Sequence, residues 1–328
     1  MKVDYDRSTL TTGIVHLGVG AFHRAHQAVY TDAVLSRFGG DWGICGVSLR
    51  SSSARDALAG NHNLYTVAVR APDGTRLQTI GALTSVLVAP EDPSAVIAAI
   101  ADARVAVVTM TITEKGYCLS PASGRLDFSH PDISHDLTVA GAPKSAFGFL
   151  AEALVQRQQQ DSGGLTVISC DNLAGNGNKL RDALLAFARS RDARLAAWID
   201  ENCSFPNTMV DRIVPATTRA DLDEVAAAIG HEDPAAVVTE PFSQWVIERN
   251  FVGRVPPWDQ VGARFVDDVA PYERMKLRLL NASHSCMAYL GSLAGFKTVN
   301  EVISDPAFAA LIRQLMAEEM APTLTDLD

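Results

Sequence analysis

The stretch GIVHLGVGAFHRAHQAVY, residues 13–30, begins with a short apolar run, passes through two glycines and continues with apolar residues at helical spacing. We expect it to form a β-strand, a glycine turn and an α-helix. Gly18, Gly20 and His23 follow a G-x-G-x-x-G pattern in which histidine replaces the third glycine. Glycines in such a turn let the backbone approach a pyrophosphate, which the helix N-terminus stabilises. An ordinary strand–helix turn would have the same local pattern. The rest of the sequence is therefore needed to distinguish such a turn from a dinucleotide-binding turn.

Strand-like and helix-like patterns alternate after this stretch, and such alternation predicts a doubly wound, mostly parallel, Rossmann-like α/β sheet. Beyond about residue 271 only helical patterns remain. We therefore expect a dinucleotide-binding domain over 1–270 and the start of an α-helical substrate domain over 271–328. The expected strands are 13–19, 40–49, 64–69, 103–113 and 164–170, and the expected helices include 21–38, 51–60, 145–160, 178–191 and 308–320.

The composition indicates a globular protein. The 328 residues are 47% hydrophobic and carry a net charge of −10, which argues against nucleic acid or an anionic membrane as partner. We find no secretory leader and no apolar stretch of 18 residues. The five cysteines are scattered and form no C-x-x-C pair, which suits a reducing compartment. We expect a cytoplasmic protein.

The residue that usually binds the adenosine ribose of a dinucleotide would lie near the end of the second strand. The sequence there is SLRSSS, residues 48–53, without a carboxylate. Arg50 would suit the 2′-phosphate of NADP. The residues alone therefore leave NAD and NADP open.

His23 and His26 are three residues apart, one short of the H-x-x-x-H spacing, and no carboxylate lies between them. We therefore expect no metal site here. Capping and phosphate contacts are the better interpretation of His23, Arg24 and His26.

The stretch MKLRLLNASHSCMAYLG, residues 275–291, is an apolar helix interrupted by Lys276, Asn281 and His284. At about 100° per residue, Asn281 lies roughly 140° and His284 roughly 80° around the axis from Lys276, so the three share one side. Burying them without partners would cost several kcal/mol, so we expect them to face a ligand cavity or other polar groups. Desolvation would lower the pKa of Lys276 toward neutrality and make it a general base. Pro271 suits the start of this helix and Gly291 its end.

Asp171 and Asn172 follow one expected strand directly, and Glu114 follows another. Open α/β sheets bind their ligands at the carboxyl ends of strands. These residues are therefore candidates for a site, although turn and cap residues have the same pattern.

Several of these stretches together resemble the long-chain mannitol dehydrogenase family, which includes mannitol 2-dehydrogenases, arabinitol dehydrogenases and the fructuronate and tagaturonate reductases. The resemblance covers residues 14–300. It rests on IVHLGVGAFHRAHQAVY, LYTV, TITEKGY, SCDNLAGNG, FPNTMVDRIVP, EPFSQWVIERNF and PYERMKLRLLNASHSCMAYLG. The stretches TITEKGYC and APKSAFGFL are closer to the fructuronate reductase branch.

The resemblance implies zinc-independent hydride transfer between NAD(P) and the C2 carbinol of a linear polyol or aldonate. By this resemblance Lys276 is the general base, Asn172 and Asn281 hold the alcohol oxygen, and His284 orients the substrate. Glu114 would relay the proton to solvent and Asp211 would lie against the substrate. The expected cofactor contacts come from Gly18, Gly20, Ala21, Phe22, His23, Arg24, Arg50 and Thr113, with NAD as the first choice of cofactor and no metal.

Members of this family continue into further helices, which supply an arginine and a lysine to the substrate. We expect that pocket wall to be missing from this sequence, and helices 275–320 to expose an apolar face that favours self-association. A rival hypothesis is a catalytically silent NAD-binding remnant that acts as a sensor or assembly partner. Turnover of a small polyol or sugar acid would separate the two.

Overall fold

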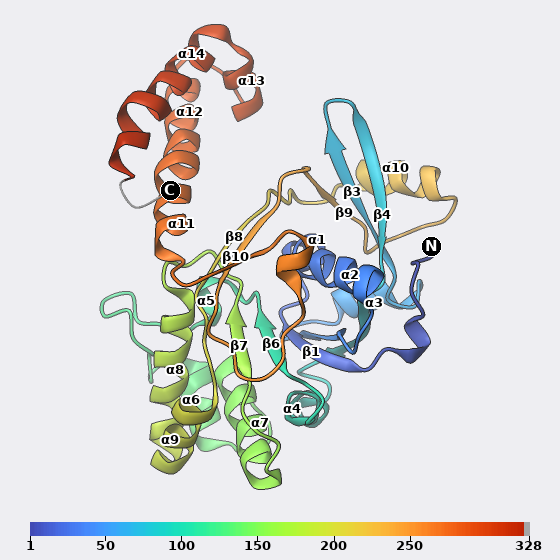
Figure 1. Cartoon of the computed structure of the whole chain (residues 1–328), viewed down its shortest axis with the longest axis vertical. Coiled ribbons are helices and arrows are strands. Elements are labelled where there is room, and N and C mark those ends of the chain that lie inside the picture. The colour runs from blue at the N-terminus through green and yellow to red at the C-terminus, as the bar shows by residue number, and fades with distance from the viewer. Residues whose placement is uncertain (325–328) are drawn as a thin grey trace. The chain divides into compact units, whose positions relative to one another are not determined.

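The computed structural model describes residues 1–324. These fall into two compact units, of which the first comprises residues 1–266 and the second begins at Asp267 (Figure 1). Within the described residues, no helix is long and apolar enough to cross a membrane.

A parallel sheet with the strand order β5-β2-β1-β6-β7 forms the centre of the first unit. The strand order changes direction between β1 and β6, the point where doubly wound folds bind their ligands. The Rossmann-like fold predicted from the sequence is confirmed. Its strands are β1 (Thr12–Leu17), β2 (Gly43–Ser48), β5 (Leu83–Val88), β6 (Val107–Met110) and β7 (Thr166–Ser169).

Each face of this sheet contributes to its own hydrophobic core, because successive strand residues point to opposite sides. Val15 and Leu17 pack with α4 (Pro93–Ala101), α7 (Ala146–Gln160), α8 (Asn176–Arg191) and α9 (Ala193–Asn202). Ile14 packs on the other side with α1 (Ala21–Ala25), α2 (Gln27–Phe38) and α3 (Ser53–Ala59), and with the buried Trp245 and Trp258. The remaining helices near the sheet are α5 (Thr113–Gly116) and α6 (Pro131–Thr138), and a short 3-10 turn spans Arg7–Thr9.

Two small sheets complete the first unit. One contains β11 (Arg264–Val266), β10 (Gln244–Glu248) and β8 (Thr208–Asp211), and a 3-10 turn over Trp258–Val261 precedes β11. The other contains β4 (Gly74–Ile80), β3 (Tyr65–Ala71) and β9 (Val237–Thr239), and α10 (Arg219–Ile229) lies between β8 and β9 in the chain. The expected strand at 64–69 thus exists but belongs to this second sheet. The turn signal Pro72-Asp73-Gly74 directs it into an antiparallel hairpin with β4.

The single helix expected over 21–38 is wrong, because the chain breaks at His26. The backbone of His26 has φ −126° and ψ −90°, which separates α1 from α2. Its Nε2 lies 2.9 Å from the carbonyl oxygen of Gln244 in β10. A partner so distant in sequence leaves no local signal.

The second unit is helical over its described residues. It contains α11 (Ala270–Met275), a π-helical turn over Lys276–Asn281, α12 (Ala282–Leu293), α13 (Val299–Ser304) and α14 (Pro306–Gln314), followed by a π-helical turn over Leu315–Met320 and a 3-10 turn over Ala321–Thr323.

Pro271 lies in the first turn of α11, as expected. The expected helix end at Gly291 is wrong, since α12 continues to Leu293 and Gly295 follows with φ +88°. Gly291 is instead a packing position, because a Cβ there would lie 2.2 Å from Cγ2 of Val302 in α13. The apolar side chains of Leu277, Tyr289 and Leu293 are exposed, in line with the exposed apolar face expected for this stretch.

Candidate active site

The glycine turn after β1 is shaped by two different constraints. Gly18 has φ +99°, and a Cβ on it would lie 2.1 Å from the carbonyl oxygen of Thr111. Gly20 donates its N–H to the Gly18 carbonyl at 2.7 Å and begins α1. A Cβ on Gly20 would meet nothing closer than the Gly18 oxygen at 3.9 Å. Space is therefore open above the Gly20 backbone, as a phosphate in close approach would require.

A pocket of about 600 Å³ lies at this turn, at the carboxyl ends of β1, β2 and β6. Its walls include Gly18, Gly20, Arg50, Lys115 and Lys144. Its volume lies in the range of small-molecule sites. Three cationic side chains face one carboxylate among the described lining residues, and this excess of positive charge suits a pyrophosphate. The pocket therefore fits a dinucleotide.

The structure separates the expected cofactor residues into two groups. Gly18, Gly20, Arg50 and Thr113 line the pocket. The others, Ala21, Phe22, His23 and Arg24, follow in α1 and lie outside the set of residues that line the pocket.

The imidazoles of His23 and His26 are fully buried, which corrects the expectation that they contact phosphate. The His23 ring stacks on the His16 ring of β1 with centroids 3.4 Å apart. The His26 ring stacks on Phe22 and contacts the Gln244 carbonyl. At the third position of the glycine pattern, the His23 ring therefore packs α1 against β1. A glycine at this position would let the two backbones approach directly.

His16 is part of a buried polar cluster at the end of β1. Its Nδ1 lies 2.7 Å from Oγ1 of Thr109, and its Nε2 lies 2.8 Å from Oγ1 of Thr111 and 3.1 Å from the Gly18 carbonyl. Burial lowers the pKa of His16 to about 3 and that of His23 well below its usual value. Both rings are therefore neutral at physiological pH, and the cluster fixes Gly18 to the ends of β1 and β6.

The Asp171 carboxylate joins the ends of β6 and β7. It accepts the backbone N–H groups of Ile112 at 3.1 Å and Thr113 at 2.8 Å, and the Tyr117 hydroxyl at 3.0 Å. Burial raises the pKa of Asp171, against the effect of these three donors. Thr113 has φ +65°, an unfavourable conformation for a β-branched residue, and the carboxylate holds it there.

Two expected catalytic residues lie beside this carboxylate. Glu114 is in the first turn of α5, directly after Thr113, and Asn172 follows Asp171 in the chain; both side chains are exposed. Glu114 therefore follows the loop that the Asp171 carboxylate fixes, and Asn172 is the next residue after Asp171 in the chain. Asp211 ends β8 and pairs in register with Gln244 of β10.

Asn176 connects β8 to this region, a role that no pattern in the sequence indicates. Its amide nitrogen donates to the carbonyls of Ser169, Asp171 and Thr208, and its Oδ1 accepts the Thr208 N–H. Asn176 is fully buried, so it fixes the segment that carries Asn172. The polar cluster DNLAGNG was visible in the sequence, but its partners in β8 were not.

Lys276, Asn281 and His284 all lie on the helix of the second unit, and each is partly exposed. The angle of 140° expected between Lys276 and Asn281 is wrong, because these two residues begin and end a π-helical turn. In this turn the Ala282 N–H donates to the Leu277 carbonyl, five residues back. A π-helical turn brings residues five apart close to the same side, and such turns are frequent at functional sites.

The structure shows no group of three or more His, Cys, Asp or Glu side chains, within the described part of the chain, that could hold a metal ion. Cys118 borders the pocket, but burial raises its pKa to about 11, which leaves an unreactive thiol.

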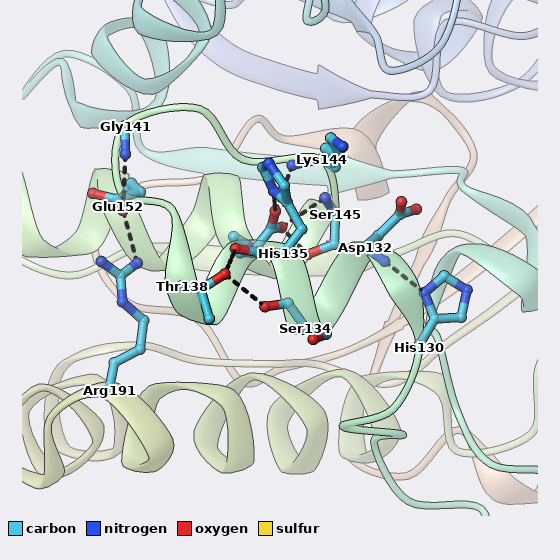
Figure 2. Close-up of polar contacts among 12 residues, drawn as sticks. His130, Asp132, Ser134, His135, Thr138, Gly141, Lys144, Ser145, Glu152 and Arg191 are labelled. Atoms are coloured by element: carbon cyan, nitrogen blue, oxygen red, sulfur yellow. Dashed lines mark hydrogen bonds and ion pairs between the residues drawn. The ribbon is translucent and has the colours of Figure 1, made fainter.

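The segment 130–146 supplies further pocket residues that the sequence did not indicate, namely His130, Asp132, Lys144 and Ser145. Figure 2 shows these residues around α6, where the Asp132 N–H donates to Nδ1 of His130 at 3.2 Å. His130-Pro131 is a helix-start signal that could have located α6, but no local pattern indicates that α6 borders the pocket.

Fold and site together define a Rossmann-type nucleotide-binding unit followed by a helical unit. The family description "Mannitol dehydrogenase Rossmann domain" matches residues 12–260, and "Mannitol dehydrogenase C-terminal domain" matches residues 268–328. The chain belongs to the mannitol dehydrogenase family.

Relatives in this family are polyol and sugar-acid oxidoreductases. The chain is 49% identical to D-mannonate oxidoreductase of Escherichia coli (strain K12), over 99% of this chain and 68% of that protein. It is 46% identical to mannitol 2-dehydrogenase of Pyricularia oryzae, over 98% of this chain and 66% of that protein. The structure of Pseudomonas fluorescens mannitol 2-dehydrogenase in a ternary complex with NAD and D-mannitol superposes with a TM-score of 0.90 at 44% identity, over 99% of this chain and 68% of that one. The chain thus spans about two thirds of the length of these relatives.

Proposed function

We propose that this protein is an NAD-dependent 2-dehydrogenase of a linear polyol or aldonate, of the mannitol/fructose or mannonate/fructuronate type. The observation that carries the proposal is the pocket at the Gly18–Gly20 turn, in a chain that is 44% identical to a mannitol 2-dehydrogenase solved with NAD and D-mannitol. The 49% identity to D-mannonate oxidoreductase supports a sugar acid as the first substrate to test.

NAD, when bound, supplies the acceptor for the hydride from the C2 carbinol. The Gly18–Gly20 backbone and the cations around it would hold the pyrophosphate, and Thr113 would lie beside the cofactor. The carboxylate of Asp171 keeps Thr113 in its φ-positive conformation.

We assign the proton chemistry to the side chains named by the family resemblance. The Lys276 Nζ takes the proton of the C2 hydroxyl, which an amine can do once its pKa lies near the working pH. The amides of Asn172 and Asn281 donate to the oxygen as its negative charge grows. His284 orients the substrate, Asp211 lies against it, and the exposed Glu114 passes the proton to water.

A turnover assay tests this proposal. The purified chain is incubated with NAD and D-mannonate, D-mannitol or D-arabinitol, and absorbance reports NADH. We expect NADH to form with at least one of them, and the reverse reaction to consume NADH with the matching ketose or keto acid. Tight NAD binding without turnover of any of these substrates would instead favour a nucleotide-binding remnant.

A further inference from the structure

The pocket has an unusual arrangement at the end of β2. A dinucleotide-binding unit selective for NAD usually places a carboxylate there, which accepts a hydrogen bond from the adenosine ribose, whereas an arginine accommodates the 2′-phosphate of NADP. This chain has Arg50 at that place, and Ser48 and Ser51 line the pocket close to it in the sequence. Its local sequence therefore offers a cation for a 2′-phosphate and no carboxylate for a ribose hydroxyl.

A carboxylate reaches the same place from a distant part of the chain. Asp132, in the first turn of α6, accepts from the Arg50 guanidinium with Nη2 and Oδ2 2.9 Å apart. The Asp132 side chain is 16% exposed and the Arg50 side chain 70% exposed. The Asp132 carboxylate is thus the buried member of the pair in the pocket wall, and the exposed Arg50 side chain extends to it.

The position of Asp132 is fixed by its own helix. Pro131 occupies the start of α6, and the Asp132 N–H donates to Nδ1 of His130 (Figure 2). Asp136, one turn further along α6, accepts the N–H groups of Lys144 and Ser145 and so ties α6 to the start of α7. The carboxylate therefore belongs to a rigid wall of the pocket.

We propose that Asp132 is the residue that selects NAD over NADP in this pocket, which extends the proposed function. A carboxylate is an acceptor only, so it suits the 2′-hydroxyl of NAD, which can donate. A 2′-phosphate offers acceptor oxygens and carries a charge between −1 and −2 at neutral pH. Since Arg50 and Asp132 are in contact, a phosphate that reaches Arg50 also meets the Asp132 carboxylate.

The other charged side chains that line the pocket support Asp132 as the residue that selects the cofactor. Within the described part of the chain, Asp132 is the only carboxylate among the residues that line the pocket, where Arg50, Lys115 and Lys144 are cationic. Without Asp132 the rim would consist of cations and serine hydroxyls, which is the chemistry of a phosphate site. The selectivity for NAD therefore depends on a residue 82 positions after Arg50.

The experiment measures dissociation constants by calorimetry for the full chain with NAD and with NADP, and for its variant Asp132→Asn, which keeps the size and removes the charge. We expect the wild type to bind NAD at least tenfold more tightly than NADP, and Asp132→Asn to reduce this ratio at least tenfold. Asp132→Ser provides a second variant if the first fails to fold. The double variant Arg50→Ala/Asp132→Asn should lose the gained NADP affinity.

The matched control is Asp127→Asn, because Asp127 is a carboxylate of the same segment that accepts from Ser129 and lies outside the pocket lining. This control should keep the wild-type ratio. A folded Asp132 variant with an unchanged ratio, or a wild type that prefers NADP, would overturn the inference and leave the proposed dehydrogenase intact. A wild type that binds neither cofactor would overturn the proposed function as well.

Discussion

Individual side chains and glycines at strand ends define the chemistry of this protein. The structure places Gly18, Gly20, Arg50 and Thr113 at one pocket, as the sequence suggested. The sequence could not reveal Asp132 or Asn176, because their partners, Arg50 and Thr208, are 82 and 32 residues away. Residues that line the pocket can thus be predicted from a motif, whereas Asp132 and Asn176 act through contacts with distant parts of the chain.

Replacing Lys276 with Met should lower the rate of alcohol oxidation by several orders of magnitude, because methionine keeps most of the volume but cannot take a proton. The affinity for NAD should change little. Steady-state rates and calorimetry measure the two effects separately. Lys297→Met, at an exposed lysine of the same unit, is the control. A near-parental rate in Lys276→Met would show that Lys276 is only structural.

Gly20→Ala should leave the fold intact and weaken NAD binding at least tenfold. The added Cβ would meet no protein atom closer than 3.9 Å, so it would occupy the space proposed for a phosphate. Gly18→Ala should instead destabilise the protein, because its Cβ would lie 2.1 Å from the Thr111 carbonyl oxygen. Thermal denaturation and calorimetry on both variants check this contrast. Unchanged NAD affinity in Gly20→Ala would place the phosphate elsewhere.

At the level of helices and strands, local patterns predicted the main elements well. The strands at β1, β2, β6 and β7 and the helices at α7 and α8 all exist where apolar periodicity placed them. The failures occurred where a distant contact or a local irregularity decides the backbone. His26 breaks a helix while contacting β10, and Gly291 packs against α13 inside a helix it was expected to end.

The stacked histidines between α1 and β1 should make the first unit sensitive to acid. The pKa of His16 is lowered to about 3 in the folded protein from 6.5, so the unfolded chain binds the additional proton. Its stabilising contribution is complete above pH 6.5 and is lost as the pH falls toward 3. At pH 5 the loss amounts to about 2 kcal/mol for this one residue.

Urea unfolding of the wild type and of His16→Gln at pH 7 and pH 5 measures this effect. The wild type should lose more stability between the two pH values than the variant, by about 2 kcal/mol. The comparison uses the change with pH, so a general loss of stability in the variant does not affect it. His62→Gln, at an exposed histidine, is the control. Equal pH dependence in His16→Gln and wild type would show that His16 is not buried as a neutral ring.

At the scale of the whole molecule, activity should not depend on a metal ion. The described residues offer no cluster of metal ligands, and the proposed base is an amine. Prolonged dialysis against a chelator should leave the oxidation rate unchanged. Loss of activity that zinc restores would contradict the assignment of Lys276 as the base.

The proposed function depends on direct transfer of a hydride from the reacting carbinol carbon of the substrate to the cofactor. We would incubate the chain with NAD and either D-mannitol deuterated at its equivalent C2 and C5 or D-mannonate deuterated at C5, the carbon that becomes C2 of fructuronate, and then analyse the reduced cofactor by mass spectrometry. We expect one deuterium atom in each molecule of reduced cofactor and a slower rate than with the unlabelled substrate. Reduced cofactor without deuterium, or no reduced cofactor with either substrate, would contradict it.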